Sequence, residues 1–184
     1  MTVNSTASTA RGPDLVYIEA FVADHRSLLD RLRAQTTWDE RMRARRTASF
    51  GVPYDYSGMT YPAAPMPDAI ADIRDALAEI LPLAPNNCLV NDYEDGRSTM
   101  GFHADSIREL VPGTGVAIVS LGATRTLSFR RIVEREIEVA RPLAGGSVMY
   151  MTPQVQGLWK HGIRREEGVG ARISLTFRQI LSAG

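Results

Sequence analysis

The chain has 184 residues, a length typical of one domain, because a hydrophobic core rarely grows past roughly 250 residues before the chain divides. With 44% hydrophobic and 23% charged residues its composition is that of an ordinary globular protein, and no apolar run approaches the ~20 residues of a membrane helix. The 21 basic and 21 acidic residues cancel, which excludes the strong overall basicity of many nucleic-acid-binding proteins.

The N-terminal residues 1–13 are polar and lack the apolar core of a signal peptide, so we expect a flexible tail and a cytoplasmic protein. Cys88 is the single cysteine and cannot form an internal disulfide, which agrees with a reducing compartment. We interpret it as a buried thiol. We expect a monomer that does not contact membranes.

Two amphipathic helices are predicted in the first half of the chain. After a first strand over residues 15–21, the leucine spacing predicts a helix over residues 23–35. A second helix begins near Pro67, a residue type that the first helical turn tolerates. The apolar positions of these helices are Leu28, Leu29 and Leu32 in the first and Ile70, Ile73, Leu77, Ile80 and Leu81 in the second.

Residues 47–65, which separate the two helices, are rich in Gly, Pro and Tyr and show no steady periodicity. This composition predicts a long functional loop or an irregular hairpin. Four arginines precede it: Arg41, Arg43, Arg45 and Arg46. Such a cluster usually forms a solvated face, and the alternative is a contact with phosphates.

From residue 87 onward the pattern changes to short β segments separated by turn signals such as Asp95-Gly96. Two helices followed by about eight strands predict an α+β, mainly β fold: a sandwich or jelly roll buttressed by the two helices on one face. The predicted strands span residues 87–93, 100–105, 115–122, 125–133, 135–143, 146–151, 158–163 and 171–178.

His103 and Asp105 lie two positions apart in a predicted strand, so their side chains would point to the same side of the sheet. His161, in a different late strand, would complete a set of two histidines and one carboxylate. Such a set binds iron(II) on one face and leaves positions open for substrates. Taken alone, a His-x-Asp pair is a weak signal. The alternative is a surface pair, or a core histidine bonded to its neighbour.

The last predicted strand alternates cleanly between apolar and polar residues. If helices cover its apolar face, Arg172 and Arg178 point into the barrel, where unpaired charge would be very costly. A guanidinium matches a carboxylate, and 2-oxoglutarate carries two of them. The alternative is an exposed strand with solvated arginines. The apolar positions are Ile173, Leu175 and Phe177, and the polar positions are Arg172, Ser174, Thr176 and Arg178.

Asn91 and Tyr93 repeat the two-residue spacing shortly before the His-x-Asp pair. Their amide and phenol would lie on one side of a strand, where they would complete a 2-oxoglutarate site. The alternative is a pair of ordinary polar strand residues that includes a buried tyrosine.

Several motifs in a fixed order resemble the AlkB family of nucleic-acid dealkylating dioxygenases, and most closely its DNA-repair members in animals. The resemblance covers residues 46 to 180, and the combination of motifs is highly specific. The motifs are NDYEDG, HADSIRELVPG, SLGATRTLSFR, LAGGSVMYM, the histidine of WKH and the terminal RISLTFR.

The resemblance implies a double-stranded β-helix in a single domain over residues 14–184, with its core at residues 88–180. The family uses iron(II), 2-oxoglutarate and O2 to dealkylate N-alkylated bases in DNA or RNA. The implied iron ligands are His103, Asp105 and His161. The implied 2-oxoglutarate ligands are Asn91, Tyr93, Arg172, Ser174 and Arg178.

Residues 46–66 resemble the substrate-recognition loop of the family, in which Tyr54 and Tyr56 would cover or stack on a flipped base. Stacking of a base on an aromatic ring contributes ~1–3 kcal/mol. Ordinary loop packing is the alternative. Ile107 stands where repair members usually carry an acidic residue that contacts the alkylated base, so a cationic methylated base would lose a carboxylate partner.

Two further features depart from the family. Ser174 replaces an asparagine beside the cosubstrate, although serine keeps some hydrogen-bonding capacity. The sequence lacks the hydrophobic finger that animal repair members insert into duplex DNA, and the one candidate wedge, Trp38, is expected to be packed instead. Dealkylation of nucleobases is the leading hypothesis. The alternatives are a hydroxylase acting on a small metabolite or free nucleotide, and a non-catalytic nucleic-acid-binding module.

Overall fold

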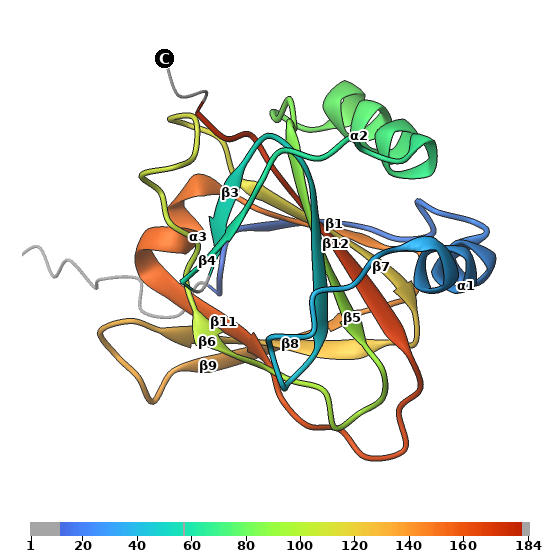
Figure 1. The fold of residues 1–184 in the computed structure, drawn as a ribbon. Coiled ribbons are helices and arrows are strands. Elements are labelled where there is room, and N and C mark those ends of the chain that lie inside the picture. The colour runs from blue at the N-terminus through green and yellow to red at the C-terminus, as the bar shows by residue number, and fades with distance from the viewer. Residues whose placement is uncertain (1–11, 57, 182–184) are drawn as a thin grey trace, which may run out of the picture.

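The computed structural model describes residues 12–56 and 58–181, which form a major sheet, a minor sheet, a two-stranded hairpin and three helices (Figure 1). The major sheet contains, from edge to edge, β1 (Leu15–Ile18), β10 (Val148–Met151), β7 (Val116–Gly122), β12 (Arg172–Arg178), β5 (Asn87–Tyr93) and β2 (Arg46–Gly51). The minor sheet contains β6 (Met100–His103), β11 (Trp159–Ile163), β8 (Arg125–Arg131) and β9 (Glu138–Leu143). The hairpin contains β3 (Tyr54–Tyr56) and β4 (Met59–Tyr61), and the helices are α1 (His25–Gln35), α2 (Asp68–Ile80) and α3 (Pro153–Leu158).

The helices α1 and α2 cover the outer face of the major sheet (Figure 1). Ile173, Leu175 and Phe177 of β12 point into this helix-covered core and are fully buried. The predicted alternation of β12 is therefore confirmed on its apolar side. The mainly β jelly roll with helices on one face is confirmed as well.

A second core fills the space between the two sheets. Leu89 and Ile118 of the major sheet pack in the same cluster as Leu127 and Phe129 of the minor sheet. Because side chains alternate along a strand, each central strand of the major sheet contributes one face to each core. The polar face of β12 therefore points between the sheets.

Asp92 fastens the helix layer to the major sheet. Its side chain is fully buried on the outer face of β5, where Arg33 of α1 and Arg46 of β2 donate hydrogen bonds to the carboxylate. A buried carboxylate is tolerated because it is paired and hydrogen-bonded. The prediction of a solvated arginine cluster is therefore wrong for Arg46.

Trp38 packs at the edge of the helix-covered core, as predicted. Its indole Nε1 donates to the carbonyl oxygen of Arg33 at 3.2 Å, and the guanidinium of Arg46 lies 5.3 Å from the ring centroid. The Cys88 thiol is buried in the same core, also as predicted, and burial raises its pKa.

Three local expectations need correction. Ile80 is 50% exposed, because α2 ends there and Leu81 takes the buried position in an extended conformation. Between α1 and α2 the structure contains β2 and the β3–β4 hairpin, so of the two predicted alternatives the hairpin is confirmed and the long loop is wrong. The helix α3 was not expected in the sequence. Residues 1–11 of the expected N-terminal tail lie outside the described residues.

None of the helices in the described ranges combines the length and the apolar character that crossing a bilayer requires.

Replacing Asp92 by Ala should lower the free energy of unfolding by roughly 1–3 kcal/mol, because it removes the hydrogen bonds of the partly exposed Arg33 and Arg46 guanidinium groups to their buried anion. Urea denaturation followed by circular dichroism measures this loss. Asp75→Ala, which removes an exposed ion pair with Arg74, should leave the midpoint unchanged and serves as the control. Equal stabilities of the two variants would contradict the role of Asp92.

Candidate active site

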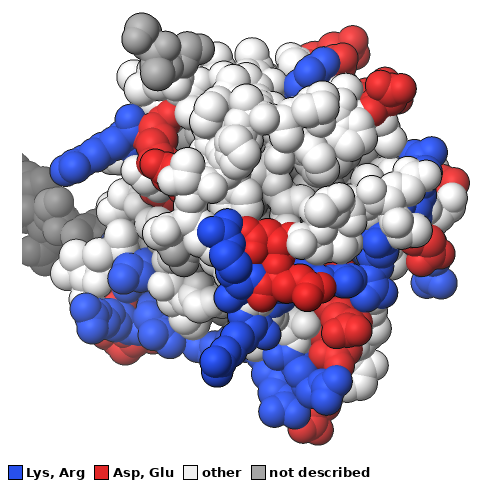
Figure 2. All heavy atoms as spheres, viewed as in Figure 1, with Lys and Arg blue, Asp and Glu red and all other residues white. Residues whose placement is uncertain are grey.

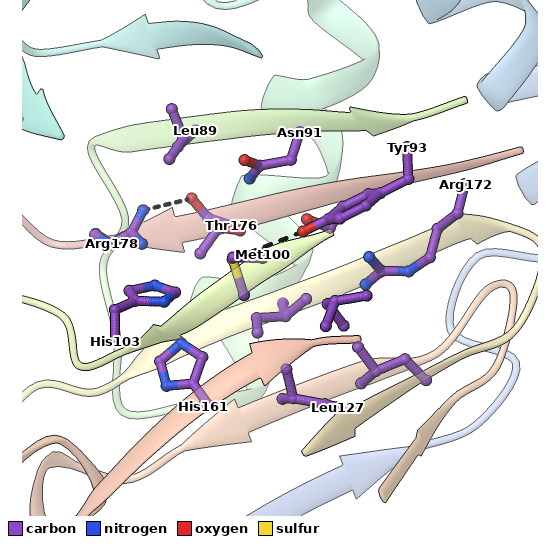
Figure 3. A pocket seen from close by; sticks show the side chains of 14 residues that line it. Leu89, Asn91, Tyr93, Met100, His103, Leu127, His161, Arg172, Thr176 and Arg178 are labelled. Carbon is purple, nitrogen blue, oxygen red and sulfur yellow. Dashed lines mark hydrogen bonds between the residues drawn. The ribbon is translucent and has the colours of Figure 1, made fainter. Parts of the chain in front are cut away.

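A cavity lies between the two sheets, and both sheets line it (Figure 3). The minor sheet contributes two histidines and the apolar side chains of Leu127, Leu143 and Ile163. The major sheet contributes polar side chains, namely Asn91 and Tyr93 of β5 and Arg172, Ser174, Thr176 and Arg178 of β12. The polar side of β12 therefore faces the cavity, as the alternation predicts.

His103 and His161 face each other across the β6–β11 pair, in which they are direct partners. Their ring centroids are 4.5 Å apart. His103 Nδ1 hydrogen-bonds the carbonyl oxygen of Gly101 at 2.9 Å, so Nδ1 carries the proton and Nε2 is the nitrogen that would coordinate a metal ion. Together with Asp105 they form a compact donor set, in which one ligand atom from each residue lies within 4.8 Å of the others.

Asp105 reaches this set in a different way from the one the sequence predicts. The strand β6 ends at His103, so strand alternation does not place the carboxylate. The Asp105 main-chain N–H donates to the side-chain oxygen of Gln156 at 2.8 Å, and Arg178 donates to Asp105 Oδ1 through both Nε and Nη2. The second carboxylate oxygen, Oδ2, lies 3.7 Å from His161 Nε2.

The protonation states suit a metal site. Burial raises the pKa of the Asp105 carboxyl, but Arg178, His161 and His103 outweigh it and bring the pKa to about 2. Burial lowers the pKa of His161 to about 3. A carboxylate and a neutral imidazole are the forms that bind a metal ion. Asp105 Oδ2 and His161 Nδ1 are buried without a hydrogen-bond partner in the described residues, so the donor set fits a bound cation.

Arg172 lies at the other end of the cavity from the histidines (Figure 3). It is 1% exposed, its guanidinium carbon lies 5.1 Å from the ring centroid of Tyr93, and its Nη2 donates to Ser120 Oγ at 3.0 Å. Its Nε and Nη1 are buried without a hydrogen-bond partner among the described residues. Burial lowers the pKa of Arg172 to about 10, so the group is still a cation at neutral pH. A buried cation with two unused donors fits a carboxylate ligand.

Arg178 is 2% exposed and sits beside the histidines (Figure 3). Because it is already paired with Asp105, the two arginines that look equivalent in the sequence differ in the structure. Arg172 lines the cavity with two donors that have no partner among the described residues, whereas Arg178 is ion-paired with a candidate metal ligand.

Asn91, Tyr93 and Ser174 line the cavity as predicted. The Tyr93 hydroxyl contacts Met100 Sδ at 3.6 Å. Asn91 Oδ1 accepts a hydrogen bond from Arg45 Nε at 2.7 Å, an interaction that leaves the amide NH2 as a donor. Arg45 is thus buried rather than solvated. Its neighbours in the sequence are mostly charged, and this pattern does not predict the contact.

The predicted substrate-binding residues are not among the described side chains that line the cavity. Tyr54 is buried, and the guanidinium carbon of Arg178 lies 4.8 Å from its ring centroid. Tyr56 belongs to the same strand, but its side chain is outside the described part of the structure. Ile107 is 63% exposed, on the chain that follows Asp105. The roles of these residues stay predictions.

The chain matches the 2OG-Fe(II) oxygenase superfamily over residues 20–178. It is 37% identical over 139 residues to the mouse protein named DNA oxidative demethylase ALKBH2, a match that covers 71% of this chain and 58% of the relative. The human protein of the same name is 36% identical over 139 residues, with 71% and 53% covered. These matches confirm the resemblance to the AlkB family.

A rat protein named alpha-ketoglutarate-dependent dioxygenase alkB homolog 3 is 29% identical over 177 residues, which cover 83% of this chain and 59% of the relative. The chain therefore spans little more than half the length of these curated relatives. The solved structure of OsALKBH1 superimposes with a TM-score of 0.68 at 19% identity, over 92% of this chain and 100% of that one. At this identity the superposition shows the shared fold.

Replacing Arg172 by Met should stabilise the ligand-free protein by roughly 1–4 kcal/mol, because it removes a buried cation whose donors are only partly satisfied. The same variant should lose the rise in melting temperature that 2-oxoglutarate gives the wild type in the presence of Mn(II), since ligand binding stabilises only a protein that retains the site. Arg141→Met, on the exposed face of β9, is the matched control. An unchanged response of the Arg172 variant to 2-oxoglutarate would contradict this assignment.

Proposed function

The chain belongs to the 2OG-Fe(II) oxygenase superfamily, and on this basis we propose that it is a dioxygenase that oxidatively dealkylates N-alkylated nucleobases in DNA or RNA. One observation carries the proposal. The His-Asp-His donor set and the buried, incompletely bonded Arg172 lie at opposite ends of one cavity. A ligand with two carboxylates would be held at one end by the metal and at the other by Arg172.

His103, Asp105 and His161 would hold iron(II), which supplies the activation of O2 for oxidation of a C–H bond when it is bound. Asp105 contributes one negative charge, so the site would remain cationic and able to accept an anionic cosubstrate. The ion pair with Arg178 keeps one carboxylate oxygen away from the donor set and leaves the other turned toward His161.

Arg172 would bind the far carboxylate of 2-oxoglutarate, because its buried guanidinium keeps Nε and Nη1 as donors without a partner in the described residues. Tyr93 and Ser120 hold this guanidinium in place through the ring contact and the hydrogen bond. The Asn91 amide would donate to the cosubstrate from the wall of β5. The apolar side chains of Leu127 and Leu143 exclude water from the floor of the cavity and so strengthen these polar contacts.

The β3–β4 hairpin would recognise the substrate, as part of a recognition loop over residues 46–66 within one domain over residues 14–184. Tyr54 supports this proposal because its ring packs on Arg178, which is paired with the candidate metal ligand Asp105. Tyr56 would offer an aromatic surface to a flipped base. Ile107 would leave the rim without the acidic contact of the repair members.

Oligonucleotides that contain 1-methyladenine or 3-methylcytosine should lose the methyl group when incubated with the protein, iron(II), ascorbate and 2-oxoglutarate. Mass spectrometry of the oligonucleotide measures the loss, and succinate should form in equal amount. His161→Ala should form neither product, because it removes a candidate metal ligand. Succinate formation without any change in the oligonucleotides would contradict the nucleobase assignment.

A second candidate function is hydroxylation of a small metabolite or free nucleotide with the same iron chemistry. The zero net charge and the exposed Ile107 favour it, since neither feature attracts a phosphate backbone or a cationic base. On the face of the molecule that Figure 2 shows, basic and acidic side chains are interspersed. A product screen on nucleotides and metabolites tests it. Selective turnover of alkylated polynucleotide would contradict it.

A further inference from the structure

We propose that Gln156 of α3 is a positioning residue for the metal ligand Asp105, and that it sets the metal affinity of the site. The inference rests on the proposed iron site, and it concerns a residue to which neither the sequence motifs nor the comparisons assign a role. The side chain of Gln156 hydrogen-bonds the main-chain N–H of Asp105, so Gln156 would act on the position of this metal ligand and not on the metal itself.

The argument starts from the main chain of Asp105. This residue lies two positions after His103, the last residue of β6, where the β6–β11 ladder has ended, and it is 6% exposed. Its N–H therefore needs a partner, because a buried main-chain amide without a hydrogen bond is unfavourable. Gln156 supplies that partner through its side-chain oxygen at 2.8 Å.

Gln156 is itself placed by a short helix with one buried side. Within α3, Val155 and Gln156 are buried, whereas Gln154 is exposed. Gln156 is 4% exposed, and its amide nitrogen lies 4.0 Å from Met151 Sδ at the end of β10. Burial of a polar side chain to this degree is unfavourable unless the side chain is hydrogen-bonded. The bond from the Asp105 N–H satisfies the side-chain oxygen of Gln156.

The helix also connects two of the candidate ligands. Its last residue, Leu158, is followed directly by β11, which carries His161 three positions later. The hydrogen bond from Asp105 to Gln156 therefore fastens the chain after β6 to the segment that enters β11. Any shift of that segment would move the carboxylate and the imidazole together.

Two restraints thus act on Asp105. Gln156 holds its main chain, and Arg178 holds Oδ1. With both in place, Oδ2 has no hydrogen-bond partner in the described residues and lies 3.7 Å from His161 Nε2. Without the main-chain restraint, the ion pair with Arg178 would pull the Asp105 carboxylate away from the histidines.

Cobalt(II) is the probe for this inference, because its binding and its visible spectrum are measured without turnover. Gln156→Met keeps the volume of the side chain but removes the acceptor, and it should weaken cobalt(II) binding about 10- to 100-fold by calorimetry and change the visible spectrum. Gln154→Met on the exposed side of α3 is the matched control and should behave as the wild type. Gln156→Glu restores an acceptor oxygen and should recover most of the affinity.

Gln156→Asn provides a second test if the Met variant fails to fold, because its amide is one methylene too short to reach Asp105 and it should show the same loss. A merely structural role predicts a lower melting temperature with unchanged cobalt(II) affinity and spectrum in the folded variants, and this result would overturn the inference. If cobalt(II) binding is absent in the wild type, or persists in His161→Ala, the proposed iron site falls and the inference falls with it. If only the Gln156 variants behave as the wild type, the iron site stands and the inference alone falls.

Discussion

The ion pair between Arg178 and Asp105 is the interaction on which the rest of the site depends. An isolated carboxylate at this depth would take up a proton, since burial alone raises its pKa. The guanidinium keeps Asp105 ionised, while burial keeps the neighbouring His161 neutral. A carboxylate and a neutral imidazole are the forms that bind a metal ion, so the ion pair favours the metal-binding form of the donor set.

The strand β12 carries Arg178 and lies between the helix-covered core and the cavity. One face of the strand carries the apolar residues that hold the helix layer, and the other carries Arg172 and Arg178 at the two ends of the cavity. The two arginines are not redundant. Arg178 is paired with Asp105, whereas Nε and Nη1 of Arg172 have no hydrogen-bond partner in the described residues, so the cavity has a histidine end and an end with a partly unbonded cation.

Period-two patterns in the sequence predict much of this arrangement, because a strand with two different faces must turn its polar side toward something that satisfies it. The polar face of β12 and the pair Asn91 and Tyr93 were predicted in this way and lie where expected. Asp105 was predicted for a reason that does not hold, since its strand ends two residues earlier. Arg45 and Gln156 were missed because their partners lie 46 and 51 positions away, and no local periodicity reports such contacts.

The β3–β4 hairpin forms a small sheet of its own, apart from the ladders of the major and minor sheets. The ladders that position the two histidines and the two arginines belong to the minor and major sheets, and among the described strands β3 and β4 pair only with each other. The backbone hydrogen bonds that shape the hairpin are therefore separate from those that shape the cavity, so the sequence of the hairpin can change without a change of register at the cavity wall.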